Sequence, residues 1–268
     1  YSAHDMSDGK RFMIIDGNAL LHRAWHALPP LTTKKGEIVN AVYGFTMILL
    51  KALKDLTPTY AAVTFDRRAP TFRHEAFKEY KAKRVKQPQE LYDQIDHIKH
   101  ILTALHIPIF EKDGFEADDS IATICTYISQ EDSQIKKIIL SGDLDLLQLV
   151  DANTHLYTPK KGISDIAIYD EQGVQERYGI EPKQLLYFKA LRGDQSDNIP
   201  GVKGIGEKTA RELIQAFGSL DAIYDALERG AADSIKKQVA EKLKAQKKEA
   251  LLSLSLVRLV HDVPIDFS

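Results

Sequence analysis

The sequence contains a single cysteine, Cys125, so no disulfide can form within these 268 residues. Cys125 lies among apolar residues at helical spacing, which is typical of a small core residue and not of a nucleophile or metal ligand. No uninterrupted apolar stretch approaches the roughly 18 residues of a membrane-spanning helix, and no secretory signal pattern opens the chain. These absences predict a protein of the reducing cytoplasm that does not contact a membrane.

Clusters of nitrogen and sulfur ligands are also missing. The pairs His22/His26 and His97/His100 have helical spacing, but no third His or Cys accompanies either pair, which disfavours zinc. The stretch GIGEKT is superficially similar to a phosphate-binding loop, yet its spacing is incomplete and it follows a helical stretch. Zinc chemistry and P-loop nucleotide binding are therefore poor interpretations of this chain.

Charge is abundant and unevenly distributed. The chain has 36 Lys and Arg against 38 Asp and Glu, which gives a formal net charge of −2. Between Arg67 and Lys86, however, eight Lys or Arg residues occur with only two Glu. The near-neutral total therefore conceals a basic segment suited to phosphate, while the acidic residues can gather at a cation site elsewhere.

Short apolar segments rich in Ile, Val and Phe alternate with longer helical patterns such as 40–56 and 91–105. This alternation predicts an α/β fold with a mainly parallel sheet covered by helices. The expected strands lie in RFMIIDGN, YAAVTFDRR, HIPIFEKDGFE and KKIILSGDLD, with THLYTP and IAIYD as a further pair. From about Ile180 onward the pattern is entirely helical, so we predict an α/β core at 11–172 and a helical region at 173–268. The opening YSAHDMSDGK has no periodicity and is set aside, with a cloning remnant expected before Met6.

Acidic residues follow the expected strands at the points where they end. The group comprises Asp16, Asp66, Glu116, Asp118, Asp119, Asp143 and Asp145. Because the carboxyl ends of parallel strands meet at one edge of a sheet, four distant segments deliver acids to the same place. A single Asp there would be interpreted as a helix cap, but clusters at several ends exceed what caps need. Ligands that offer only oxygen select hard cations such as Mg²⁺ or Mn²⁺, and their number indicates a two-metal site for phosphoryl chemistry.

Asp118 stands out within this group. Ile121, Ile124, Cys125 and Ile128 form an apolar helical stripe, and Asp118 lies on that stripe one turn earlier. We therefore expect its carboxylate to point toward the buried face, where it needs a counter-charge. A metal ion would supply that charge.

The stretch GDQSDNIPGVKGIGEKTARELI, residues 193–214, combines acids with a glycine-rich turn. Asp194 and Asp197 are three residues apart, so they could share one face with the acidic edge. Gly204 and Gly206 make a tight hairpin before an apolar-faced helix, with Lys203, Lys208 and Arg211 beside it. Glycine allows backbone N–H groups to approach a phosphate, and a helix N-terminus attracts negative charge. The pattern favours a contact with the DNA backbone over a plain helical corner.

In combination, the motifs IDGN, FDRRAPTFRHEAFKEYKAKR, GFEADD, SGDLDLLQL and GDQSDNIPGVKGIG resemble the 5′-nuclease (flap endonuclease) family. The resemblance is greatest to the 5′→3′ exonuclease domain of bacterial DNA polymerase I, and it extends from about Arg11 to the C-terminus. It implies an α/β nuclease core with a helical arch at 67–90 and a C-terminal helix-hairpin-helix. It also implies a monomeric DNA enzyme of replication and repair in the bacterial nucleoid, with a polymerase domain as a possible covalent neighbour.

The resemblance further implies residue roles. One Mg²⁺ would be held through Asp16, Asp66, Glu116, Asp118 and Asp119 with Asp143, and a second through Asp143, Asp145, Asp194 and Asp197, partly through water. Mn²⁺ would substitute, and K⁺ is implied at the hairpin. Lys81 and Arg84 match catalytic cations on the arch. The implied DNA contacts are Arg73, Tyr80, Lys81, Arg84, Lys203, Gly204, Gly206 and Lys208.

Two other functions stay open. A PIN-type ribonuclease would share the acidic α/β core, but the glycine hairpin, which is suited to a duplex, argues against it. A non-catalytic DNA-binding module would use the hairpin and basic segment, but it would leave the acidic cluster without a purpose, since carboxylates repel DNA unless metals intervene.

Overall fold

The computed structural model describes residues 9–159, 166–232 and 234–267, so the expected cloning remnant lies outside the described residues. The chain forms two compact units. The α/β unit comprises residues 1–71, 86–170 and 259–268, and the helical unit comprises 72–85 and 171–258. These units are not continuous in sequence, unlike the predicted domains 11–172 and 173–268. Part of the basic arch segment belongs to the helical unit, and the last ten residues belong to the α/β unit.

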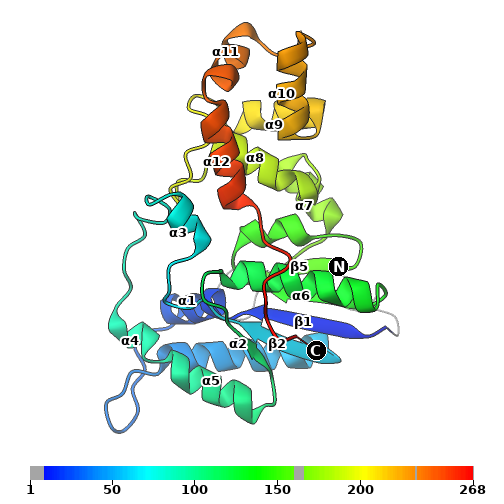
Figure 1. Ribbon diagram of the computed structural model, residues 1–268. Coiled ribbons are helices and arrows are strands. Elements are labelled where there is room, and N and C mark those ends of the chain that lie inside the picture. Colours follow the sequence, from blue (N-terminus) through cyan, green and yellow to red (C-terminus); the bar gives the residue numbers. More distant parts are fainter. Residues whose placement is uncertain (1–8, 160–165, 233, 268) are drawn as a thin grey trace. The chain divides into compact units, whose positions relative to one another are not determined.

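A six-stranded sheet forms the centre of the α/β unit (Figure 1). Its order is β3-β2-β1-β4-β5-β6, and every neighbouring pair is parallel except β5–β6. The strands are β1 (Arg11–Asp16), β2 (Tyr60–Thr64), β3 (Ile109–Phe110), β4 (Lys136–Leu140), β5 (Thr154–Pro159) and β6 (Ile166–Tyr169). All six predicted strands are therefore confirmed, although β3 has only two residues.

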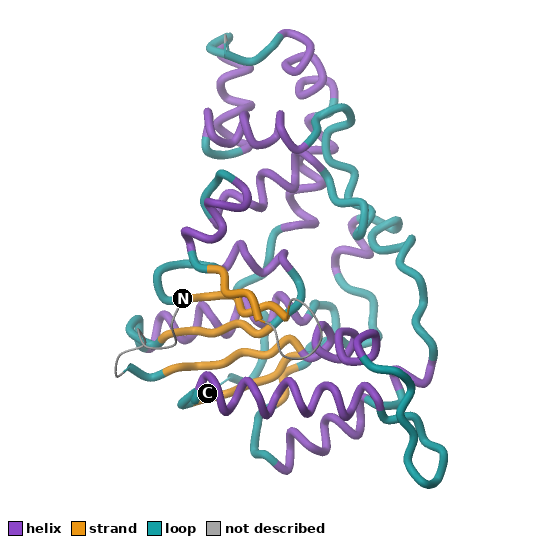
Figure 2. Tube along the Cα trace, turned by 180° about the vertical axis from the view of Figure 1, so that it is seen from behind, coloured by secondary structure: helices purple, strands orange, loops and turns teal. Residues whose placement is uncertain are grey.

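Helices cover both faces of this sheet, with α1, α2 and α5 on one side and α6 on the other (Figures 1 and 2). The unit's helices are α1 (Gly17–Ala27), α2 (Asn40–Leu56), α4 (Gln89–Tyr92), α5 (Ile95–Ala104), α6 (Ala117–Glu131) and the 3₁₀ helix η1 (Leu144–Leu149). Side chains alternate along β1, so Met13 and Ile15 join the core that Phe45 and Ile48 of α2 complete. None of the described helices is both long and apolar enough to cross a lipid bilayer.

The C-terminal tail packs on the α/β unit, and its aromatic contacts come from Phe267. The Phe267 ring lies 5.8 Å from Phe12, 5.3 Å from Phe110 and 5.0 Å from Tyr127, measured between centroids. The Tyr127 contact is edge-on and the other two are tilted, and aromatic contacts of this kind add to the stabilisation from buried area. They explain why the tail leaves the helical region to which the sequence pattern assigned it.

The helical unit confirms the predicted all-helical pattern of the C-terminal region. Its elements are α7 (Glu171–Tyr178), the 3₁₀ helix η2 (Pro182–Gln184), α8 (Leu185–Arg192), α9 (Glu207–Phe217), α10 (Leu220–Arg229), α11 (Lys237–Ala245) and α12 (Lys247–Val257), together with α3 (Phe72–Ala76). Helices α8 and α9 flank the glycine hairpin. Ser219 caps α10 by accepting the Ala222 N–H at 3.2 Å.

The predicted helical arch at 67–90 is helical only in part. It contains α3, then a tight turn over residues 77–84, and α4 begins at its end. Within the turn the Tyr80 N–H donates to the Phe77 carbonyl at 2.9 Å, and the Arg84 N–H donates to the Lys81 carbonyl at 3.0 Å. Lys81 has a φ of +55°, which is incompatible with a continuing right-handed helix.

Arg73 is buried in the helical unit, which corrects its predicted role as a DNA contact. Its side chain is 1% exposed. Nε donates to the Leu256 carbonyl at 2.8 Å and Nη2 donates to the Arg258 carbonyl at 2.9 Å. These carbonyls end α12, where the helix dipole favours a cation. The charge therefore holds α3 to α12 and cannot reach a phosphate from this position.

We expect Arg73→Met to lower the free energy of unfolding by about 3 kcal/mol, because it leaves helix-end carbonyls without their charged donor. Arg229→Met is the matched control. Arg229 lies in the same unit, is 77% exposed and pairs only with Asp225 at 3.5 Å among the ion pairs of the described residues. Urea unfolding followed by circular dichroism measures both. If the free energy of unfolding falls by the same small amount in both variants, the Arg73 contacts do not contribute to stability.

Candidate functional site

Asp16 is the innermost of the acids at the carboxyl edge of the sheet. It ends β1, between β2 and β4, where the strand order reverses, and it is 4% exposed. Oδ1 accepts the Ala19 N–H at 2.9 Å and Oδ2 accepts the Ser141 hydroxyl at 2.6 Å. Burial raises the pKa of Asp16 to about 7 despite these hydrogen bonds, and the negative charges of Asp66 and Asp143 raise it further. The structure thus brings two other predicted acids, Asp66 and Asp143, close enough to repel Asp16.

Asp143 and Asp145 follow β4 and are ordered through Ser141. The Asp143 N–H donates to Ser141 Oγ at 2.9 Å, and the Asp145 N–H donates to Asp143 Oδ1 at 2.8 Å. Ser141 therefore links the β4 exit to Asp16 with one hydroxyl. Ser141 was not among the predicted site residues, although its position two residues before Asp143, directly after a strand, was a usable signal.

Asp66 connects the β2 exit to two other segments. Its N–H donates to Asn18 Oδ1 at 2.9 Å, and its own Oδ1 accepts the Ala117 N–H at 2.7 Å. The residue before Asn18 must be small: a Cβ on Gly17 would lie 2.4 Å from the Phe65 ring. Asn18 was also missed as a functional residue, although it is part of the IDGN motif. Together these contacts fix the β1, β2 and α6 ends to one another.

The start of α6 corrects the prediction that Asp118 is the buried acid. Asp118 is half-buried, whereas Asp119 is 0% exposed. Asp119 Oδ2 accepts the Glu116 N–H at 3.1 Å in a capping box with Glu116, and its Oδ1 accepts the Val260 N–H at 2.9 Å. Its charge is therefore met by one backbone N–H at the start of α6 and one from the C-terminal tail, and both of its oxygens already have partners.

The acids of this edge offer only oxygen atoms, which suits a hard divalent cation. Within residues 9–159, 166–232 and 234–267, no three His, Cys, Asp or Glu side chains stand ready to hold a metal ion as placed. Asp16, Asp66 and Asp143 instead each accept a hydrogen bond from a backbone N–H. Ion binding would exchange some of these hydrogen bonds for metal ligation and relieve the repulsion around Asp16.

Asp194 and Asp197 belong to the helical unit, and both are paired with cations there. Partial burial alone would raise the pKa of Asp194, but the Lys189 ammonium at 2.8 Å and the Ser196 hydroxyl and N–H hold it well below its usual range. Asp197 Oδ1 accepts Arg84 Nη2 at 2.5 Å and Nε at 3.1 Å. Lys81 Nζ lies 3.9 Å from Asp197 Oδ2.

Tyr80 is 3% exposed, which corrects its prediction as a DNA-binding aromatic. The rings of Tyr80 and His74 are edge-on at 5.3 Å between centroids, and Lys81 Nζ lies 4.9 Å from the Tyr80 centroid. A ring enclosed in this way has no face on which a base can stack.

The hairpin between α8 and α9 exposes the four hairpin residues that were predicted to contact DNA. Lys203, Gly204, Gly206 and Lys208 are all exposed, whereas Val202 and Ile205 are buried at 2% and 4%. Gly204 has a φ of +87°, and Gly206 is the N-cap residue of α9. Lys242 Nζ donates to the Gly204 carbonyl at 3.2 Å. The geometry presents backbone and ammonium groups on one turn at a helix N-terminus.

Comparison with known proteins assigns both parts of the chain. Residues 11–179 match the family described as "5'-3' exonuclease, N-terminal resolvase-like domain", and residues 180–268 match "5'-3' exonuclease, C-terminal SAM fold". DNA polymerase I of Bacillus subtilis (strain 168) is 42% identical over 263 residues, which are 98% of this chain and 29% of that protein. DNA polymerase I of Mycobacterium tuberculosis (strain H37Rv) is 41% identical over 94% of this chain and 27% of its own length. The chain therefore spans less than a third of these relatives.

Solved structures share the fold. The flap endonuclease of bacteriophage T5, in a complex with DNA and metal ions, has a TM-score of 0.73 and 25% identity, covering 92% of this chain and 89% of that one. The catalytic core of Rad2 in complex with DNA substrate has a TM-score of 0.60 and 19% identity, covering 95% and 82%.

For the protein in EDTA, we expect the melting temperature to fall as the pH rises from about 5 to about 8. Native Asp16 keeps its proton up to about pH 7, whereas the unfolded chain releases it near 4. The stability that the proton confers is present in acid and is lost as the pH rises through 7, at up to about 1.4 kcal/mol per pH unit. Asp16→Asn should flatten this profile, and Asp96→Asn, an exposed acid on α5, should not. If the melting temperatures of wild type and Asp16→Asn change with pH in parallel, a group other than Asp16 causes the pH dependence.

Proposed function

Because the chain belongs to the 5'-3' exonuclease family, we propose that it hydrolyses phosphodiester bonds at 5′ ends and 5′ flaps of DNA with the help of divalent metal ions. One observation carries the proposal. Asp16, a buried acid with a raised pKa, lies within electrostatic reach of Asp66 and Asp143 at the switch point of a parallel sheet. Such crowding destabilises the protein unless a cation, or a proton in its place, neutralises it.

Two Mg²⁺ ions, for which Mn²⁺ would substitute, would supply charge neutralisation at the scissile phosphate and activation of the attacking water. Asp16, Asp66, Glu116, Asp118 and Asp143 would hold the first. Asp143 and Asp145 would hold the second, with Asp194 and Asp197 as outer partners through water. Asp119 belongs to the same group, but its two oxygens accept backbone N–H bonds, so its contribution would be to orient Glu116 and Asp118.

Lys81 and Arg84 would stabilise the negative charge that develops on the phosphate as the bond to the leaving 3′-oxygen breaks. The Arg84 side chain is 52% exposed, and two nitrogens of its guanidinium already donate to one carboxylate oxygen of Asp197, a contact that a phosphate oxygen could take over. Lys81, at 19% exposed, would act as a point charge beside it.

The hairpin would bind duplex DNA through Lys203, Lys208 and the backbone at Gly204 and Gly206. A K⁺ ion at the hairpin is part of the proposal, although the Lys242 ammonium would compete with it for the Gly204 carbonyl. The DNA would carry a single-stranded 5′ end joined to a duplex. The relatives are full-length DNA polymerase I, so we further propose a covalently linked polymerase domain, a monomeric enzyme and a place at the bacterial nucleoid in the cytoplasm.

The decisive experiment is single-turnover cleavage of a 5′ flap on duplex DNA, with and without Mg²⁺. We expect wild-type cleavage to require the ion and Asp143→Asn to abolish it, because Asp143 is the ligand that both ions would share. Asp96→Asn removes the same charge from the same unit and should cleave normally. Cleavage by wild type in excess EDTA would refute the two-metal proposal.

A single-stranded RNA of the same sequence is the second substrate. Preferential RNA cleavage would support the PIN-type ribonuclease instead. Tight duplex binding with no cleavage of either substrate would support the non-catalytic module.

We expect Gly204→Val to weaken duplex binding by at least about tenfold, since a β-branched residue resists a φ of +87° and holds the phosphate off the backbone. A Cβ at this position would also lie 2.7 Å from Lys242 Nζ. Gly230→Val carries similar backbone strain, at φ +69° after α10, with no atom within 4 Å of the new Cβ. Fluorescence anisotropy with a labelled duplex compares them. If both variants bind DNA as wild type does, the hairpin is not the duplex contact.

A further inference from the structure

The tight turn at 77–84 is docked within the helical unit on the loop 194–199. The Lys81 N–H donates to the Asp197 carbonyl at 2.9 Å, and Asn198 Nδ2 donates to the Glu79 carbonyl at 2.8 Å. The Asp197 carboxylate receives Arg84 at 2.5 and 3.1 Å, and the Tyr80 hydroxyl lies 3.5 Å away. Each of the two segments thus donates at least one hydrogen bond to the other, and these bonds involve both backbone and side-chain groups.

Backbone conformation where the turn 77–84 meets the loop 194–199 indicates that contacts between them hold the turn in place. Lys81 has a φ of +55° and Asn198 a φ of +57°, so a left-handed residue stands on each side. Asn tolerates this region, but Lys adopts it rarely. The unusual conformation of Lys81 persists because its N–H is held by the Asp197 carbonyl and its ammonium is near the same residue's carboxylate.

The charges around Asp197 also indicate that this residue anchors the turn. Asp197 is 7% exposed, and a carboxylate at that depth needs cationic or hydrogen-bonding partners. Its partners are the two arch cations, with Arg84 engaged through two nitrogens. An acid that served only as a water-mediated ion partner would not require a guanidinium in this geometry.

We propose that Asp197 is a positioning residue that anchors the turn 77–84, and with it Lys81 and Arg84, before metal or DNA binds. The anchor fixes the direction of both side chains, so the cations are presented as a pair and do not have to be ordered by the substrate. A DNA phosphate then takes over the Arg84 contact, because phosphate and carboxylate accept the same two N–H groups. The backbone bonds of Lys81 and Asn198 keep the turn in place during that exchange.

The role in cleavage rests on the proposed function, but the anchoring does not. Amide hydrogen exchange read by mass spectrometry measures the anchoring in EDTA, where a role of Asp197 as an ion partner has no effect. We expect Asp197→Asn to speed exchange of the peptide covering 77–84 by at least about tenfold, while α9 exchanges as in wild type. Exchange of 77–84 at the wild-type rate would overturn the proposal.

Arg84→Gln tests the same contact from the arch side, where the side chain is half exposed and folding is safe. It should also speed exchange of 77–84, and the double variant should add little to either single change, since both remove one interaction. Independent, additive effects would overturn the proposal. If Asp197→Asn exchanges faster throughout the helical unit, the Arg84→Gln result decides alone: faster exchange confined to 77–84 supports the anchor, and wild-type exchange refutes it.

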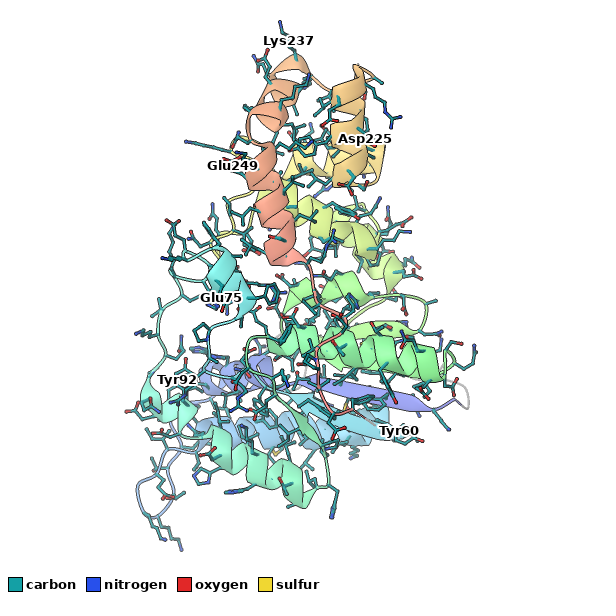
Figure 3. The ribbon with its side chains drawn as sticks, viewed as in Figure 1. Tyr60, Glu75, Tyr92, Asp225, Lys237 and Glu249 are labelled. Atoms are coloured by element: carbon teal, nitrogen blue, oxygen red, sulfur yellow. The ribbon has the colours of Figure 1, made fainter. Side chains whose placement is uncertain are left out.

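Asp225→Asn is the control for loss of a carboxylate from the same unit. Asp225 lies on α10, well away from Glu75 on α3 (Figure 3), and it pairs with the exposed Arg229. Its exchange at 77–84 should match wild type, and faster exchange there would overturn the proposal. With saturating Mg²⁺ and flap DNA, Asp197→Asn should slow single-turnover cleavage and make a further Lys81→Ala change less costly than it is in wild type. Normal cleavage with fast exchange at 77–84 would keep the anchor and count against the proposed role of the two cations.

Discussion

The burial of one carboxylate at the end of β1 constrains most of the α/β unit. Asp16 sits where the strand order reverses, and its oxygens are met by an N–H of α1 and by the Ser141 hydroxyl beyond β4. The exits of β1 and β4 must therefore keep a fixed separation. Asn18 and Asp66 impose the same condition on β2 and α6. The hydrogen bonds that satisfy the acids are thus also the contacts that hold the sheet edge in shape.

The acids of the two units are balanced in different ways. Asp16 is met by neutral donors, so burial, together with the charges of Asp66 and Asp143, keeps its pKa raised. Asp194 and Asp197 are balanced by Lys189 and Arg84, which removes most of their field. Since a free divalent cation is attracted by uncompensated charge, we expect an ion to bind first at the sheet edge, as the proposed function requires. The helical unit is better suited to holding basic side chains in defined directions.

The sequence was sufficient for the fold because its strands are buried and its helices have one apolar face. The predicted helix at 40–56 coincides with α2, and all six strands are present. Details of the site were less accessible. Asp118 and Asp119 are adjacent at a helix start, so helical periodicity could not predict which of them is buried. Asp119 is the buried one because it forms the capping box with Glu116. Arg73 bonds to carbonyls 183 and 185 residues away, a contact that no local pattern encodes.

Basic residues in the segment 67–86 show why charge alone is an incomplete guide to DNA contacts. Arg73 donates hydrogen bonds to carbonyls at the end of α12, and Arg84 and Lys81 are paired with Asp197. A cation that is already paired can still bind DNA if the new partner matches the old one in charge and geometry. Arg84 meets that condition because its partner is a carboxylate and its side chain is half exposed; Arg73 does not, because its partners are buried carbonyls. Exposure and partner chemistry, and not the number of positive charges, therefore decide which of these side chains can meet a phosphate.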